Sequence, residues 1–205
     1  LVSIPTPEDA KRNGPSIYGI TKKNQEDMFF SIGKAYQIPT VALRFFNAFG
    51  TRQSLSNPYC GVAAIFLSRV KNNQPPIINE DGLQTRDFIY ISDITKAIEF
   101  SLEKDEANYE AFNIGSGAPI TIKQVANDVI DLYKSNLKPQ ITLNFRNFDV
   151  RHCFADTTKA KSKLGWQPKV NFKDGLKKVF EWSKSEKAQD KMEESIAELK
   201  KRKLI

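Results

Sequence analysis

The sequence has few of the residues that build metal sites or disulfide frameworks. Its 205 residues include two cysteines, Cys60 and Cys153, and one histidine, His152. No Cys-x-x-Cys pair occurs, and His152 beside Cys153 does not complete a zinc site by itself. We therefore expect both thiols to be reduced and no metal to be bound.

Long apolar runs are also missing. No stretch approaches the roughly 18 apolar residues that a membrane-spanning helix needs. The chain opens with the polar, proline-broken segment LVSIPTPEDAKRNGPS, which lacks the cationic and then apolar order of a signal peptide. These two absences predict a cytoplasmic protein without a membrane partner.

Charge is unbalanced, with 31 Lys and Arg residues against 24 Asp and Glu residues. A basic excess raises the hypothesis of a nucleic-acid or other anionic ligand. Lysines are concentrated in residues 176–205, where both signs alternate at helical spacing, as is typical of a solvated helix face. Because no nucleic-acid-binding motif accompanies the charge, we expect no nucleic-acid partner.

Helical and extended patterns alternate along the chain, which is typical of an α/β fold. Apolar spacing predicts a helix from Ser16 to about Tyr36, and the apolar run 40–46 predicts a strand covered on both faces, as in parallel sheets. Further predicted helices span 61–73, 91–104 and 121–134, with two more around a Trp-Gln-Pro corner within 157–184. Further predicted strands lie within 75–79, 86–93, 111–117 and 139–147.

The glycine-rich turn of a dinucleotide site is absent. A G-x-G-x-x-G turn between a strand and a helix cradles the pyrophosphate in such folds. The G-x-G of this chain, Gly115 to Gly117, is followed by Pro119 and has no third glycine. We interpret it as an ordinary turn at the end of a strand.

Tyr18 and Lys22, in SIYGITKK, lie one helical turn apart and therefore share a helix face. The spacing alone fits an ordinary surface pair. It also fits an acid–base pair, because a phenol with a pKa near 10 becomes a useful base when a nearby ammonium stabilises the phenolate.

Seven blocks of sequence, in one order, resemble those of extended short-chain dehydrogenase/reductases, and most closely those of NAD-dependent nucleotide-sugar epimerases such as dTDP-L-rhamnose and UDP-glucose 4-epimerases. They are YGITK, LRFFNAFGTRQ, NPYCGV, EDGLQTRDFIYISDI, FNIGSG, DVRHCFAD and KLGWQPKV. The likeness extends over essentially the whole chain. It implies the C-terminal half of a Rossmann-like doubly wound parallel sheet and a small mixed α/β substrate-binding lobe. It assigns 1–46 and 80–115 to the NAD-binding domain, 47–79 and 116–175 to the lobe, and 176–205 to a C-terminal helical segment.

The resemblance also implies catalytic and cofactor-binding residues. Tyr18 would take and return the proton of a sugar hydroxyl while the sugar carbon gives hydride to nicotinamide. Lys22 would bind the nicotinamide ribose and lower the pKa of Tyr18. Phe45 and Phe46 would lie at the nicotinamide, although the same pattern fits two ordinary core aromatics. The Ser or Thr that the family places about two dozen residues before the tyrosine falls outside the chain.

The implied ligand is a dTDP- or UDP-hexose, whose diphosphate suits guanidinium groups and a helix N-terminus. The residues expected to bind it are Asn47, Asn57, Gly61, Val62, Ile77, Ile78, Asn79, Arg86, Arg146, Asp149 and Arg151. Two simpler interpretations stay open at this point: Arg86 pairs with Asp87, and 75–79 is merely a strand. Asn147 and Phe148 also replace the Pro and Gly that relatives usually have in that loop.

The function implied is NAD-dependent 4-epimerisation of a nucleotide sugar through a 4-keto intermediate. A 4,6-dehydratase or decarboxylase would share the first step, and a non-catalytic nucleotide-sugar-binding remnant is the alternative of another class. We expect a homodimer through the first helix, with Phe29 and Ile32 exposed on an apolar stripe. Residues 1–205 alone are expected to be an inactive fragment that binds NAD poorly.

Overall fold

The computed structural model describes residues 3–12, 16–57, 59–145 and 150–201. The helices are α1 (Ile17–Ala35), α2 (Val62–Lys71), α3 (Ile91–Glu103), α4 (Ile122–Leu132), α5 (Phe172–Ser183) and α6 (Met192–Lys201), with a 3-10 turn η1 (Asp105–Ala107) and a π-helical turn η2 (Ala160–Leu164). The strands are β1 (Ala42–Phe45), β2 (Asn47–Phe49), β3 (Ile77–Ile78), β4 (Thr85–Tyr90), β5 (Ala111–Ile114), β6 (Pro119–Thr121), β7 (Gln140–Ile141) and β8 (His152–Cys153). The α/β class predicted from the sequence is confirmed.

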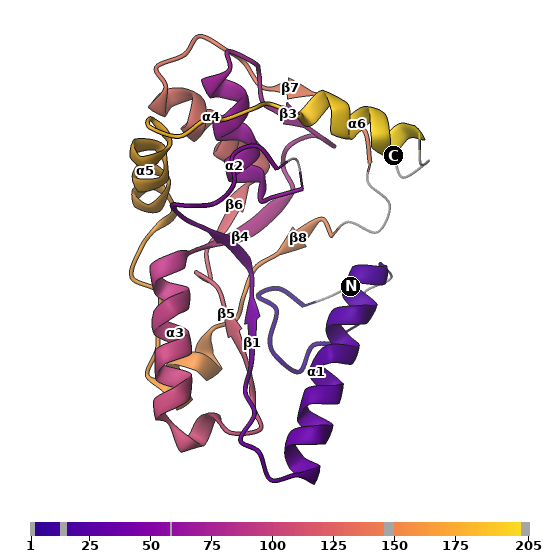
Figure 1. The fold of residues 1–205 in the computed structure, drawn as a ribbon, viewed down its shortest axis with the longest axis vertical. Coiled ribbons are helices and arrows are strands. Elements are labelled where there is room, and N and C mark those ends of the chain that lie inside the picture. The colour runs from indigo at the N-terminus through magenta and orange to yellow at the C-terminus, as the bar shows by residue number, and fades with distance from the viewer. Residues whose placement is uncertain (1–2, 13–15, 58, 146–149, 202–205) are drawn as a thin grey trace.

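Parallel strand pairs dominate, as the apolar run 40–46 predicted. β1 pairs with β5, β2 with β4, β8 with β4, and β3 with β7, all parallel. β6 pairs antiparallel with β4. The parallel β1–β5 pair lies in the lower part of the molecule, and the mixed arrangement around β4 lies above it (Figure 1).

Two apolar clusters form the core. One contains Ile89, Phe112 and Trp166, and lies among α3, β4, β5 and η2. The other contains Phe49, Phe66 and Leu176, and lies among α2, α4, α5 and the β2–β4 pair. β4 contributes to both because successive side chains of a strand point to opposite faces.

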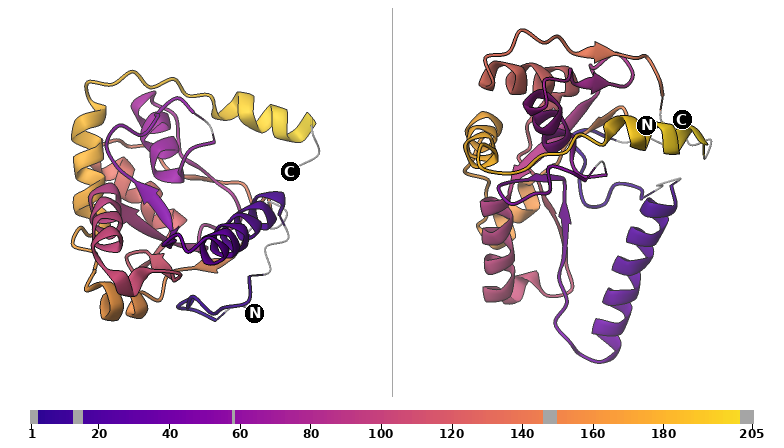
Figure 2. Two further views of the ribbon diagram at one scale, coloured as in Figure 1. Left: turned by 60° about the horizontal axis from the view of Figure 1, so that its bottom comes forward. Right: turned by 45° about the horizontal axis from the view of Figure 1, so that its top comes forward.

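Helix α1 stands on the other side of the β1–β5 pair from α3 (Figures 1 and 2). Ser16 caps it by accepting the N–H of Gly19 at 3.0 Å. Gly33 lets the end of α1 approach the segment that enters β1, because a Cβ at this position would lie 2.1 Å from Thr40 Oγ1. The short return to β1 places residues 45–47 beside α1.

The segment before α1 is hydrogen-bonded to β5 and to residues 154–156. Thr6 donates its N–H to Phe154 O at 2.8 Å, and Asp156 donates its N–H to Thr6 O at 2.9 Å. The buried amide of Asn113 on β5 donates to Thr6 O as well, at 2.9 Å. These bonds hold Thr6 against β5 and residues 154–156, while Arg12, farther along the segment, donates to Glu26 and Asp27 of α1.

Several element boundaries differ from the sequence prediction. The strand predicted at 86–93 ends at Tyr90, where α3 begins. Within the described part of the strand predicted at 139–147, which ends at residue 145, only Gln140–Ile141 is extended as a strand. The first helix of the Trp-Gln-Pro corner is mainly the π-helical turn η2, and the residues before it contain the short strand β8, which the sequence did not predict. Trp166 is buried and donates Nε1–H to Asp93 O at 2.9 Å, so η2 packs with α3. The predicted domain boundaries stay a prediction.

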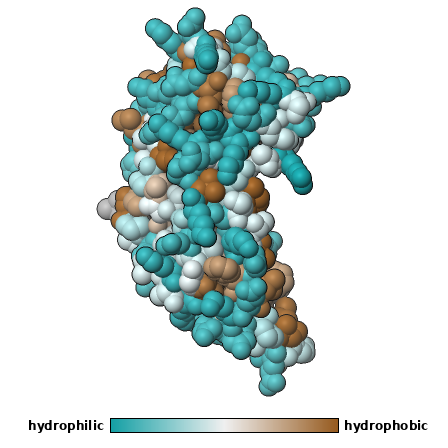
Figure 3. Space-filling view, turned by 90° about the vertical axis from the view of Figure 1, so that its left-hand side faces the viewer, coloured by the Kyte–Doolittle hydropathy of each residue, from teal (hydrophilic) through white to brown (hydrophobic). Residues whose placement is uncertain are grey.

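No helix within the described ranges is long and apolar enough to cross a membrane. The face that carries α3 and α5 is mainly hydrophilic, with small separate apolar areas (Figure 3).

Candidate active site

Tyr18 and Lys22 meet on α1, as their spacing predicted. The ammonium of Lys22 lies 5.8 Å from the ring centroid of Tyr18, within the range of a cation–π contact. Lys22 also reaches Gln25 Oε1 at 3.4 Å, and the Tyr18 side chain is exposed. The phenol is thus accessible to a ligand and lies beside a cation.

A cleft of about 520 Å³ opens between α1, the segment before it and the end of β1. Lys22, Phe45, Phe46 and Asn47 all line it, so four of the predicted site residues share one cavity. Phe45 is 46% exposed, which argues against a purely core role for this ring.

The lining of the cleft is basic. Five of the lining residues that the structure describes are cationic and one, Glu26, is acidic; the cations are Lys11, Arg12, Lys22, Lys23 and Arg44. A concave surface with this excess of one sign attracts anions. The basic balance of the sequence thus has a local counterpart at the predicted site.

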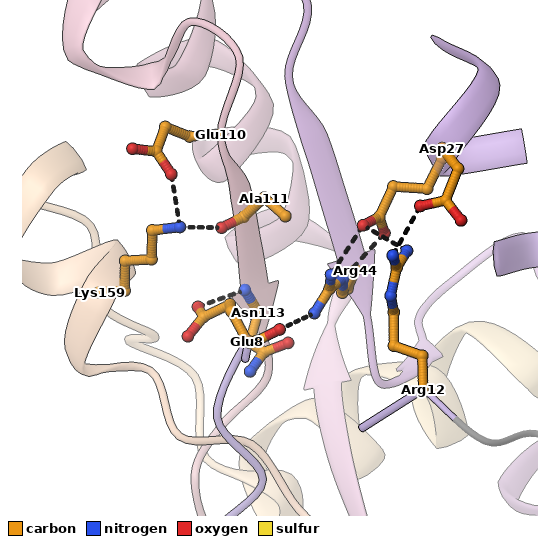
Figure 4. A network of polar contacts seen from close by, with 9 residues as sticks. Glu8, Arg12, Asp27, Arg44, Glu110, Ala111, Asn113 and Lys159 are labelled. Atoms are coloured by element: carbon orange, nitrogen blue, oxygen red, sulfur yellow. Dashed lines mark hydrogen bonds and ion pairs between the residues drawn. The ribbon is translucent and has the colours of Figure 1, made fainter. Parts of the chain in front are cut away.

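Glu26 joins α1 to β1 and to the preceding segment. Its carboxylate accepts bonds from Arg44 Nε and Nη2 at 2.9 and 2.7 Å, and from Arg12 Nη1 at 2.9 Å. Arg44 also donates to Glu8 O at 2.7 Å, and the Glu8 carboxylate accepts the N–H of Asn113. Figure 4 shows Arg12 and Arg44 side by side in this network.

The hydrogen bond from Arg44 lowers the pKa of Glu26 despite partial burial, and the same bond raises the pKa of Arg44. Both groups therefore stay charged near neutral pH. Since Glu26 is one turn beyond Lys22, and Arg44 directly precedes Phe45, this ion cluster sets the register of α1 against β1.

Arg86 and Arg151 come together at the β4–β8 pair. Arg86 Nη1 donates to the Thr85 and Arg151 carbonyls at 2.9 and 3.2 Å. Arg86 is also in register with Cys153, which lines the cleft. Two of the three arginines predicted at the diphosphate are therefore in contact with each other, and Arg86 lies next to a residue of the cleft that Lys22, Phe45, Phe46 and Asn47 line.

The head of Arg151 binds two carboxylates, at 2.8 Å from Glu80 Oε2 and 2.8 Å from each oxygen of Asp81. Its hydrogen bond to Asp81 is the main cause that lowers the pKa of this exposed carboxyl to about 2. Arg151 thus has carboxylate partners in this structure, and a diphosphate would compete with them.

Asp87 turns away from its neighbour Arg86 and organises the Gly115–Gly117 turn. Its buried carboxylate accepts the N–H groups of Ser116, Gly117 and Ala155 at 2.6, 2.9 and 3.0 Å. A Cβ at Gly115 would lie 2.5 Å from Asp87 Oδ2. The turn amides are therefore engaged by a carboxylate, in agreement with the structural interpretation of the G-x-G.

Asn57, Gly61 and Val62 lie at the start of α2. Asn57 is exposed, and its Oδ1 accepts the N–H of Tyr59 at 2.9 Å. Gly61 is the N-cap residue and, within the described part of the chain, no side chain caps this helix. Its first-turn amides are thus suited to an anion.

Ile77, Ile78 and Asn79 form β3 and the residue after it. Ile78 is fully buried in the core, and its carbonyl accepts the N–H of Thr142 at 2.9 Å. Asn79 accepts Gln84 Nε2–H through its backbone oxygen at 2.8 Å. The structure thus gives the Ile78 side chain a packing role, while Ile77 and Asn79 are half-buried.

Arg146 and Asp149 lie outside the described residues.

The sequence interpretation missed Arg12, Glu26, Arg44 and Asp87. A signal for Glu26 existed, because it follows Lys22 by four residues and thus shares the helix face of Tyr18 and Lys22.

A family model described as GDP-mannose 4,6 dehydratase matches residues 1–179. The chain belongs to this family. A dTDP-L-rhamnose 4-epimerase of Burkholderia thailandensis is 33% identical to this dehydratase-family chain over 183 residues, which cover 89% of the chain and 50% of the relative. The predicted resemblance to nucleotide-sugar epimerases and dehydratases is confirmed, and the chain spans about half the length of such relatives.

Solved structures agree with this family assignment. The UDP-glucose 4-epimerase of Thermotoga maritima, solved with UDP-glucose, superposes with a TM-score of 0.83 at 34% identity, and the match covers 90% of this dehydratase-family chain and 58% of the other. A mutant UDP-glucuronic acid 4-epimerase of Bacillus cereus, in complex with a UDP-sugar analogue and NAD, superposes with a TM-score of 0.78 at 27% identity. This match covers 86% of the present chain and 55% of the epimerase.

Proposed function

We propose that this chain supplies the acid–base and nucleotide-sugar-binding half of an NAD-dependent nucleotide-sugar 4-epimerase. The observation that carries the proposal is the basic cleft, because Lys22, Phe45, Phe46 and Asn47 line it together. The ligands named in the two solved structures above, UDP-sugars and NAD, support the ligand class.

The residues present fit the nicotinamide end of NAD. Exposed Phe45 offers an apolar surface beside Lys22, and the cavity is large enough for a ring and a ribose. For the pyrophosphate, the described part of the chain offers no glycine-rich turn after a strand, since Asp87 already uses the amides of Ser116 and Gly117. NAD, when bound, accepts a hydride from the sugar C4 and returns it.

In this proposal Tyr18 moves the proton of the sugar 4-hydroxyl. The phenolate accepts the proton as the C4–H bond breaks. The phenol returns it after the 4-keto sugar has rotated to present its other face. The ammonium of Lys22 would stabilise the negative charge of the phenolate, because opposite charges attract at short range. Lys22 Nζ already lies over the Tyr18 ring.

The diphosphate would be held by Arg86, Arg151 and the first turn of α2. Guanidinium groups bind phosphate oxygens in pairs, and uncapped amides at a helix N-terminus bind anions. Asn47 and Asn57 would add neutral hydrogen bonds. Release of Arg151 from Asp81 would accompany binding.

A 4,6-dehydratase shares the first oxidation and is the second candidate, favoured by the description of the matching family model. The products discriminate: epimerisation preserves the mass of the nucleotide sugar, whereas dehydration removes one water. Mass spectrometry of the reaction, run with a polypeptide that provides a glycine-rich half ahead of residue 1, decides between them.

The exposed face of α1 supports a homodimer. Phe29 and Ile32 are 62% and 45% exposed, as the sequence predicted, and Met28 and Tyr36 extend the same stripe. An apolar helix face of this kind is typical of an interface between two copies of a chain.

Calorimetry with residues 1–205 tests the proposal. We expect measurable binding of UDP-glucose or dTDP-glucose and none of NAD, because the contacts proposed for the sugar nucleotide lie in this chain and the pyrophosphate cradle does not. Absence of nucleotide-sugar binding would contradict the proposed function, and tight NAD binding would contradict the incomplete cofactor site.

A further inference from the structure

The segment after α5 returns across the upper part of the molecule and ends in α6 (Figures 1 and 2). We call residues 184–201 the C-terminal arm. The family model ends at residue 179, so the arm is an addition to the matched region. In the views of Figures 1 and 2, α6 projects toward the side on which α1 begins.

The arm is anchored on α2 by buried polar contacts. Arg69, only 2% exposed, donates to Asp190 Oδ2 at 2.8 Å and to Pro75 O at 2.7 Å. A guanidinium this deeply buried is strongly destabilising without a partner, so Asp190 is a firm attachment point. Asp190 Oδ1 also accepts the N–H of Met192 at 3.0 Å, which connects the anchor to the start of α6.

Two further bonds attach the arm to neighbouring segments. The N–H of Gln189 donates to Ser56 Oγ at 2.9 Å. The side chain of Asn72, at the other end of α2, donates to Ala188 O at 2.9 Å. The arm therefore connects the segment before α2 with the C-terminal end of this helix and fixes where α6 starts.

From this anchor, α6 reaches the residues that precede α2. The hydroxyl of Tyr59 donates to Glu198 Oε2 at 2.9 Å, and the N–H of Tyr59 donates to Asn57 Oδ1 at 2.9 Å. Tyr59 is 63% exposed, so packing alone does not hold its ring. The contacts run from Glu198 through Tyr59 to Asn57.

We propose that Tyr59 and Glu198 are positioning residues for nucleotide-sugar binding. The proposal rests on the proposed function, in which Asn57 and the first turn of α2 contact the ligand. The hydrogen bond to Glu198 fixes the Tyr59 side chain. The N–H of Tyr59 in turn fixes the oxygen of the Asn57 side-chain amide. The NH₂ group of that amide then remains as the donor toward the ligand. Gly61, two residues after Tyr59, is the N-cap of α2, so the same bond steadies the anion-binding end of this helix.

Calorimetric titration of residues 1–205 with UDP-glucose tests the proposal. The variants are Tyr59→Phe, Glu198→Gln and the double variant, and the matched control is Glu194→Gln, exposed on the same helix. We expect about three- to tenfold weaker binding, the net effect of one ordinary hydrogen bond, because the lost bond acts on the ligand only through Asn57. The double variant should lose no more affinity for UDP-glucose than either single variant, because each single substitution already removes the bond between Tyr59 and Glu198. Wild-type affinity in Glu198→Gln overturns the proposal.

Hydrogen exchange and thermal unfolding separate this idea from the proposed function. Glu198→Gln should speed exchange of the Tyr59 and Cys60 amides, whereas Glu194→Gln should not. The thermal unfolding midpoint of Glu198→Gln should stay within about 1–2 °C of the wild-type value, since substitutions at the surface change the free energy of unfolding little. A lowered midpoint with unchanged affinity, or unchanged exchange at Tyr59, refutes the positioning role. If the wild type binds no nucleotide sugar, the proposed function fails, and the ligand role of Tyr59 and Glu198 is refuted with it.

Discussion

The carboxylate of Glu26 on α1 receives two hydrogen bonds from the guanidinium of Arg44 on β1, at 2.9 and 2.7 Å. Both side chains are mostly buried, with 14% and 24% exposure. The pair places the helix of Tyr18 and Lys22 against the strand that ends in Phe45. This contact therefore links the stability of the fold to the placement of the candidate site.

Glu26→Gln is expected to destabilise the fold by about 2 kcal/mol, because it weakens charge-assisted hydrogen bonds in a partly buried site. Urea unfolding at pH 7 measures the difference. The control is Glu181→Gln, whose ion pair with Lys184 is exposed and should contribute less than about 1 kcal/mol. Equal losses in the two variants would argue against a special role of Glu26.

The same variant predicts a pH dependence. The pKa of Glu26 in the folded chain lies below its ordinary value of 4.5, so the unfolded chain binds the proton more readily. The stabilisation by ionised Glu26 is therefore complete above this ordinary value and is lost as the pH falls through the folded pKa. The gap in unfolding free energy between wild type and Glu26→Gln should be constant between neutral pH and about 5 and shrink below 4.5. A gap that widened in acid would contradict the sign of the shift.

Tyr18→Phe should lower kcat roughly 10²- to 10⁴-fold with little change in substrate affinity, the usual effect of removing a general acid–base group. The measurement requires a polypeptide that joins a glycine-rich half to this chain. Tyr36→Phe, at the exposed far end of the same helix, serves as the control. Full activity of Tyr18→Phe would remove the phenol from the mechanism.

Arg86→Ala should weaken UDP-glucose binding by residues 1–205 about 10- to 100-fold, because a charge-assisted bond to phosphate is lost. Lys96→Ala on α3 removes an exposed cation paired with Glu99 and controls for net charge. If the two variants bind equally well, the assignment of Arg86 to the diphosphate is wrong.

Phe29→Glu combined with Ile32→Glu should convert a dimer into a monomer, since each change places a charge on the exposed stripe of α1. Sedimentation velocity at micromolar concentration reports the state. Leu102→Glu, at a position 82% exposed on α3, should leave association unchanged. A monomeric wild type would remove the dimer from the proposal.

The sequence by itself determined the local elements and the family. Apolar spacing located α1, α2, α3 and α4, because a helix that packs on a core repeats its apolar residues every three or four positions. It also determined that Tyr18 and Lys22 meet, and that Phe29 and Ile32 are exposed. Seven ordered motifs were enough to indicate the relatives that the comparisons then showed.

Only the tertiary structure decided the polar partners. Glu26 and Arg44 are 18 residues apart, and Tyr59 and Glu198 are 139 apart; no local rule couples such positions. For Asp87 the sequence offered the neighbouring Arg86, whereas the fold brings the Ser116, Gly117 and Ala155 amides to its carboxylate. A buried carboxylate must find donors wherever packing provides them, and packing is a property of the whole chain.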